Sequence, residues 1–92
     1  MYVPINPRND VRFLRQSVYH VLEQHYPQKL TASEICANLN LQVDQWSVTT
    51  RQVSYAIRYY ALQSKYFAVF PVNGEVRYSI FINEEPYDAW RD

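Results

Sequence analysis

The dipeptide Asn73-Gly74 constrains the fold of this chain more than any other feature. Two alternating apolar runs flank it, at residues 67–72 and 75–82. Asparagine and glycine tolerate the positive φ angles that a two-residue type I′ turn requires. The pattern therefore predicts a tight β-hairpin.

The length of the turn also sets the strand register. A two-residue loop places Val69 opposite Tyr78 and Phe67 opposite Ile80, so all four side chains share one face of the hairpin. Pro71 has no N–H for a ladder hydrogen bond, which predicts that its strand lies at an edge.

Residues 49–65, before the hairpin, have the periodicity of a helix that buries one face. Thr49 and Gln52 form a capping box, which predicts the start of this helix. The inward stripe comprises Val53, Ile57, Tyr60 and Ala61, and the outward face carries Arg51, Tyr55, Arg58, Tyr59 and Lys65.

Two further helices are predicted upstream. The first runs over residues 11–25, capped by Asn9 or Asp10 and ended by Pro27. Its inward stripe is Val11, Leu14, Val18, Val21, Leu22 and His25, and Phe13 falls on the opposite face. A second capping box, Thr31 to Glu34, opens a short helix that residues 38–40 close. In the following link we expect Trp46 to pack across the two helices that it joins.

These elements predict one small α+β domain over residues 1–92, with three helices and a C-terminal two-stranded hairpin. A chain of this size buries a little over ~60% of its unfolded surface, and its 48% hydrophobic content suffices for one core. Residues 1–9 are expected to form an extended arm, 10–82 the core and 83–92 an acidic, aromatic tail.

The order helix, helix, helix, hairpin resembles the winged helix-turn-helix superfamily of DNA-binding proteins. Two segments carry the resemblance: Leu30-Thr31-Ala32-Ser33-Glu34-Ile35-Cys36, and residues 48–60, which look like a recognition helix. In size the chain is similar to small bacterial regulators. The resemblance implies a winged-helix domain whose third helix enters the major groove and whose hairpin is the wing. In that family a small residue, here Ala32 or Ala56, lets two helices approach closely.

The third helix carries side chains suited to DNA. Arginine can bridge guanine O6 and N7, glutamine can bridge adenine N6 and N7, and tyrosine can bond phosphate. Hydroxyls and free amides at a helix N-terminus favour phosphate. The predicted DNA contacts are Thr49, Thr50, Arg51, Gln52, Tyr55, Arg58 and Tyr59, with Asn73 and Arg77 from the hairpin. The alternatives are a solvated helix face and, for the last two, a turn-former and a surface arginine.

Net charge is zero, which counts against a nucleic-acid ligand, but the charges are unevenly distributed. Residues 1–80 hold eight bases and five acids (8 − 5 = +3), and residues 81–92 hold one base and four acids (1 − 4 = −3). From Gln45 to Gly74 there is no acid. Because local field governs encounter with a polyanion, the predicted contact region is still favourable.

The sequence contains no pattern that indicates a catalytic site or a metal site. His25 and Cys36 lie on apolar stripes, and structural zinc needs four ligands, usually closely spaced. No serine, histidine and carboxylate occur at suggestive positions. We expect no enzyme, no cofactor and no metal.

The tail raises a separate question. Tyr87 and Trp90 are large apolar surfaces on a segment too short for its own core, and they could cover Phe13 in the same chain or in a second subunit. A homodimer on double-stranded DNA is therefore expected, with these three residues at the interface, and a tail folded back on its own first helix is the alternative.

The resulting hypothesis is a sequence-specific DNA-binding transcriptional regulator. The lone cysteine and the absence of a signal peptide or long apolar run predict a cytoplasmic location without membrane association. The main alternative is a non-catalytic protein–protein interaction module on the same scaffold. A third possibility, a tail that blocks a nucleic-acid site by mimicry, has only four acids to support it.

Overall fold

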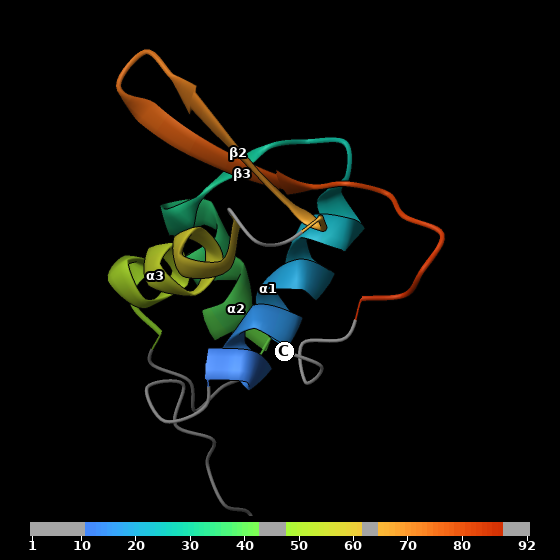
Figure 1. Ribbon diagram of the computed structural model, residues 1–92. Coiled ribbons are helices and arrows are strands. Elements are labelled where there is room, and N and C mark those ends of the chain that lie inside the picture. The colour runs from blue at the N-terminus through green and yellow to red at the C-terminus, as the bar shows by residue number, and fades with distance from the viewer. Residues whose placement is uncertain (1–10, 43–47, 62–64, 88–92) are drawn as a thin grey trace, which may run out of the picture.

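The computed structural model describes residues 11–42, 48–61 and 65–87 of the chain. The helices in this part are α1 (Val11–His25), α2 (Ala32–Gln42) and α3 (Thr50–Ala61), and the strands are β1 (Leu30–Thr31), β2 (Phe67–Val72) and β3 (Glu75–Ile80). Figure 1 shows the helices gathered beside the sheet, with the β2–β3 turn projecting beyond them. The α+β class is confirmed. The predicted arm, the Asn9 or Asp10 cap, Trp46 and Trp90 lie outside the described residues.

The three helices and the hairpin share one hydrophobic core. Each helix contributes side chains that are no more than 2% exposed: Leu14, Val18, Val21 and Leu22 from α1, Ile35 and Leu39 from α2, and Val53, Ala56 and Ile57 from α3. Phe67 and Tyr78 reach the same core from the hairpin. The predicted stripe is therefore confirmed for Leu14, Val18, Val21 and Leu22 of α1 and for Val53 and Ile57 of α3, whereas His25 is half-buried.

The arc of α1 that is buried is wider than expected. Tyr19 and Arg15 are buried, and Phe13 is half-buried and packs against the core rather than standing exposed. Tyr87 stacks on Tyr19 with ring centroids 4.4 Å apart. Residues beyond the hairpin thus cover a side of α1 that the helical periodicity had predicted to face solvent.

Two predicted helix ends were wrong. α2 continues past Asn40 to Gln42, because the Asn40 side chain bonds to Val48 instead of interrupting its own helix. The described part of α3 is Thr50–Ala61, and Lys65, the predicted end, lies in a bend before β2. The Lys65 ammonium is there 2.6 Å from the Glu85 carboxylate.

The sheet has a strand that the sequence pattern did not reveal. Its order is β1-β3-β2, and β1 pairs Leu30 with Tyr78 and Thr31 with Arg77. The predicted register of the hairpin, Phe67 with Ile80 and Val69 with Tyr78, is confirmed. β2 is an edge strand, as Pro71 predicted, although β3 ends at Ile80 and not at Ile82.

The predicted turn is also confirmed. Asn73 has φ 50° and Gly74 has φ 78°, as a type I′ turn requires. A Cβ built on Gly74 meets no atom within 4 Å. Any cost of a side chain at this position therefore comes from the backbone conformation and not from a clash.

The segment after β3 is fastened to the junction between α3 and β2. The Phe81 amide donates to the Tyr66 carbonyl at 2.6 Å, and the Asn83 side chain donates to the Lys65 carbonyl at 3.0 Å. Tyr87 then reaches Tyr19, with edge contacts to Tyr66 and Phe67. Residues 81–87 therefore connect the end of the hairpin to α1.

Among the described residues, none of the helices combines the length and the apolar character needed to cross a lipid bilayer.

Replacement of Gly74 by valine is expected to destabilise the hairpin. A β-branched residue in the left-handed region costs about 1–2 kcal/mol. No steric clash adds to this cost, because the space around Gly74 is open. Amide chemical shifts and cross-strand NOEs between Val69 and Tyr78 measure the loss.

Gly74→Asn is the matched control, because asparagine tolerates positive φ. It adds a side chain of similar size and should keep the cross-strand NOEs. Equal damage by valine and asparagine would contradict the assignment of the effect to backbone strain.

Candidate nucleic-acid interface

α3 begins with a complete capping box. The Thr49 amide donates to Gln52 Oε1 at 2.9 Å, and the Gln52 amide donates to Thr49 Oγ1 at 3.2 Å. Thr49 and Thr50 are exposed at this end of the helix. Gln52 therefore caps α3 through its carbonyl oxygen, and Thr49 takes part in the same cap through its amide and hydroxyl. The adenine contact of Gln52 and the phosphate contact of Thr49 stay predictions.

The exposed face of α3 is formed by Arg51, Tyr55 and Arg58. Tyr55 is 57% exposed, and both arginines are exposed. Spacings of four and three residues put these side chains on one face. Arg51 and Arg58 are separated by about 10 Å along the helix axis, at 1.5 Å per residue. Tyr59 lies within α3, but its side chain is outside the described set.

Four cations of α3 and of the hairpin region differ in whether they form an ion pair. Lys65 and Arg77 form ion pairs, with Glu85 in the first case and with Glu34 and Glu75 in the second. Within the part of the chain that the structure describes, Arg51 and Arg58 form no ion pair. The exposed face of α3 therefore carries two guanidinium groups whose charge is not neutralised by a neighbouring carboxylate.

A partly buried polar cluster ties the start of α3 to α2. Asn40 accepts from the Val48 amide and donates to the Val48 carbonyl, each at 3.1 Å. The Cys36 thiol donates to the same carbonyl at 2.7 Å. Burial raises the pKa of Cys36, while a hydrogen bond from Asn40 acts in the opposite direction. Both residues thereby fix the backbone immediately before the α3 cap.

The turn of the hairpin is exposed from Pro71 to Glu75. Asn73, a predicted contact, lies in this turn and is exposed. It is accessible to a ligand, but its conformation is also what the turn alone requires. Both interpretations from the sequence therefore stay open for Asn73.

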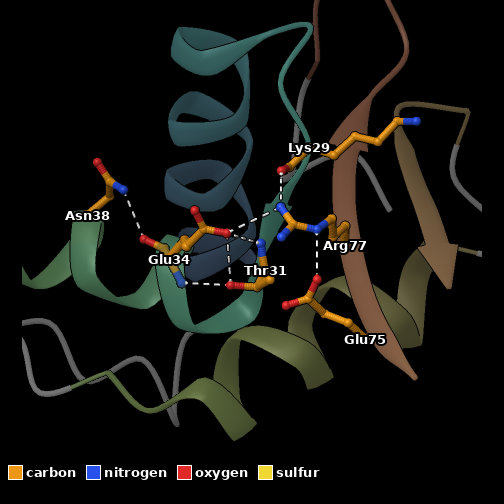
Figure 2. Close-up of polar contacts among 6 residues, drawn as sticks. All are labelled: Lys29, Thr31, Glu34, Asn38, Glu75 and Arg77. Carbon is orange, nitrogen blue, oxygen red and sulfur yellow. Dashed lines mark hydrogen bonds and ion pairs between the residues drawn. The ribbon is translucent and has the colours of Figure 1, made fainter. Parts of the chain in front are cut away.

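Arg77 bonds to other groups of the same chain at the protein surface (Figure 2). Its Nε donates to Glu75 Oε2 at 2.9 Å, and its Nη1 donates to the Lys29 carbonyl at 3.1 Å and lies 3.6 Å from Glu34 Oε1. Glu34 also accepts from the Thr31 amide and hydroxyl in the capping box of α2. This arrangement matches the surface-arginine alternative, and we no longer count Arg77 among the direct contacts.

Two of the three predicted interface residues are described. Tyr87 stacks on Tyr19 of its own chain, which is the folded-back arrangement that we weighed as the alternative to a dimer. Phe13 is half-buried against the core. Neither ring stands as an isolated exposed surface, and Trp90 is outside the described residues.

The two candidate metal ligands are used within the fold. The His25 ring bonds through Nδ1 to the Val21 carbonyl at 2.8 Å, and the Cys36 thiol bonds to Val48. In residues 11–42, 48–61 and 65–87 there is no group of three or more His, Cys, Asp or Glu side chains suited to a metal ion.

The residues that sequence analysis missed are those that hold elements together. The sequence pattern predicts a helix end at Asn40 and a capping role for Glu34. It does not predict their partners, which are Val48 for Asn40 and Arg77 on β3 for Glu34. Helical and strand periodicity do not report such pairs.

Comparisons of the chain with models of known protein families, with curated proteins and with solved structures find no match.

Replacement of Asn40 by alanine is expected to destabilise the protein by about 1–3 kcal/mol, because two backbone groups of Val48 lose a partner in a partly buried site. Chemical denaturation measures the change. Asn38→Ala is the matched control, since Asn38 lies on the same helix and only returns to the Glu34 carbonyl at an exposed position. A loss no larger than that of the control would argue against the Asn40 tie.

A pH-dependent contribution from Glu34 is also expected. The hydrogen bond from the Thr31 amide is the largest effect and lowers the pKa of Glu34 from 4.5. Desolvation acts in the opposite direction, and the Thr31 hydroxyl and the charges of Arg77 and His25 lower the pKa further, so the net shift is downward. Because the folded-state pKa is the lower one, the stabilisation is complete above pH 4.5 and is lost as pH falls through the folded-state value.

Glu34→Gln provides the comparison, because glutamine can occupy the same place in a capping box but does not titrate. The difference in denaturation midpoint between the native protein and this variant should shrink from about pH 6 to about pH 3. A difference that stays constant over this interval would exclude the proposed contribution.

Proposed function

We propose that this protein is a sequence-specific DNA-binding regulator that inserts the exposed face of α3 into the major groove. The observation that carries the proposal is the pair of unneutralised arginines, Arg51 and Arg58, on one exposed face with Tyr55 between them. Arginine is the most frequent reader of guanine in the major groove, and tyrosine hydroxyls bond phosphate oxygens.

The way α3 is held by its neighbours supports this role. Its inner face is fully buried at Val53, Ala56 and Ile57, and the Asn40 and Cys36 bonds hold the residue before its cap. A reading helix has to present its side chains within narrow limits of position. α3 meets this requirement because the core fixes one side while the other is open to solvent.

The start of α3 favours a phosphate. Thr49 and Thr50 are exposed, and the positive end of the helix dipole lies at the same place. In the proposed complex these residues contact the DNA backbone and orient the helix, while Arg51 and Arg58 reach the bases. Positioning contacts and reading contacts are separate tasks in protein–DNA interfaces.

The winged-helix arrangement is the second part of the proposal. Three helices followed by an antiparallel hairpin are compatible with it. On this model the β2–β3 hairpin is the wing, and its exposed turn around Asn73 and Gly74 approaches the adjacent backbone. The turn carries no cation between Pro71 and Glu75, so its contribution is through backbone amides and the Asn73 side chain.

Two copies on adjacent half-sites are also part of the proposal. Specific regulators commonly bind at ~10⁻⁸ M or tighter, and few phosphate contacts per copy give weak binding. Pairing raises the effective affinity without further contacts. Sedimentation equilibrium at binding concentrations, with and without DNA, decides the number of copies.

A protein ligand for the same scaffold is the competing function. Zero net charge and the 57% exposed ring of Tyr55 favour it, because tyrosine is enriched at protein interfaces. In that case the α3 face contacts a protein, and no duplex is enriched by selection.

Replacement of Arg51 or Arg58 by alanine is expected to weaken binding to the preferred duplex by about 1–3 kcal/mol and to relax base preference. The stability of the fold should change by less than about 0.5 kcal/mol, because both side chains are exposed. The duplex is first obtained by binding selection from a random pool. Fluorescence anisotropy then measures affinity at two salt concentrations.

Lys29→Ala is the charge-matched control. It removes the same unit of charge from a side chain that lies over the Phe70 ring, 4.1 Å from its centroid, and not on α3. It should leave base preference unchanged. Unaltered affinity in both arginine variants, or the absence of any enriched duplex for the native protein, would refute DNA reading by α3.

A further inference from the structure

Arg77 lies where the sheet narrows from three strands to two. β1 pairs with β3 only at Tyr78 and Arg77, and beyond Arg77 the hairpin is paired only with itself. The five residues from Pro71 to Glu75 are exposed. Arg77 is therefore the last point at which β3 is bonded to the body of the protein before the hairpin projects from it.

The side chain of Arg77 bonds across this same point. Its Nη1 reaches the Lys29 carbonyl and the Glu34 carboxylate, at 3.1 Å and 3.6 Å. Figure 2 shows the guanidinium between the strand and the first turn of α2. The main chain of Arg77 pairs with Thr31, and the Glu34 carboxylate holds the amide and hydroxyl of that same Thr31. One arginine thus joins β3, the segment before β1 and the N-terminus of α2.

The second carboxylate at Arg77 has a different effect. Glu75 belongs to the same strand and pairs with Nε at 2.9 Å. A bond within one strand cannot fix the angle between the hairpin and the helices. It does hold the plane of the guanidinium, so that Nη1 faces Lys29 and Glu34.

We propose that Arg77 is a positioning residue that sets the angle of the wing relative to α2 and α3, and thereby the distance between the wing turn and the reading face of α3. This inference rests on the proposed DNA-binding function. It assigns to the wing's arginine an indirect role, because its Nε and Nη1 atoms bond to acceptors of the same protein and its charge is shared between two carboxylates.

The first experiment examines the angle without DNA. Residual dipolar couplings of backbone amides in α3 and in β2–β3 are measured for the native protein, Arg77→Ala, Glu34→Gln and the control Glu75→Gln. Arg77→Ala and Glu34→Gln should both rotate the hairpin relative to α3. Glu75→Gln should change the angle less. Unchanged couplings in the first two variants would overturn the proposal.

The second experiment measures binding to the selected duplex as a function of salt. Arg77→Ala and Glu34→Gln are each expected to lower affinity by about two- to fivefold, in the range of an exposed ion pair. The double variant should be no weaker than Arg77→Ala alone, because both changes remove the same connection. The slope of log K against log salt should stay the same in all variants.

A direct phosphate contact predicts a different pattern. Arg77→Ala would then make the salt slope shallower by about one, and Glu34→Gln would raise affinity by releasing the arginine. That pattern would overturn the positioning role while leaving DNA binding intact. Failure of the native protein to select any duplex would instead refute the proposed DNA-binding function. The effect of the wing angle on DNA affinity would then be refuted as well, while the couplings would still test the angle itself. Thermal unfolding of each variant shows whether the variant is folded, so that a change in the hairpin angle is not confused with unfolding.

Discussion

The burial of Tyr78 is the interaction on which the rest of the structure depends. Its side chain is 2% exposed in the helical core, and its main chain pairs with Leu30 on one side and Val69 on the other. β3 is therefore both the central strand of the sheet and the strand that attaches the hairpin to the helices. Because the helical core holds β3 at Tyr78, the position of the turn at Asn73-Gly74 depends on side-chain packing among the helices.

At the start of α3, polar bonds to the backbone add to the apolar packing of the buried Val48 side chain. Val48 has its amide and carbonyl bonded by Asn40, with a further bond from Cys36. The next residue opens the helix through its own capping box. Bonds to backbone groups restrict position more narrowly than apolar contact does, since they depend on distance and direction. Because these bonds fix the start of α3, the side chains on its exposed face need no contacts with the rest of the protein to hold the helix in place.

The positive charges of α3 and of the hairpin region differ in their neighbours. Lys65 and Arg77 lie near carboxylates and connect parts of the chain, whereas Arg51 and Arg58 belong to a helix without acids. Net charge conceals this division. For a neutral protein, the argument for a polyanionic ligand depends on which cations are already paired, and that depends on the fold.

The sequence by itself determined the local structure. The hairpin register follows from Asn73-Gly74, because a two-residue turn allows one pairing, and the starts of α2 and α3 follow from capping boxes whose partners lie three residues apart. Only the tertiary structure decided the ends of α2 and α3, the strand β1, the cover of Tyr87 over Tyr19, and the partners of Arg77. The physical reason is separation along the chain. A two-residue strand has no periodicity, and an arginine bonded to residues more than forty positions away leaves no local pattern.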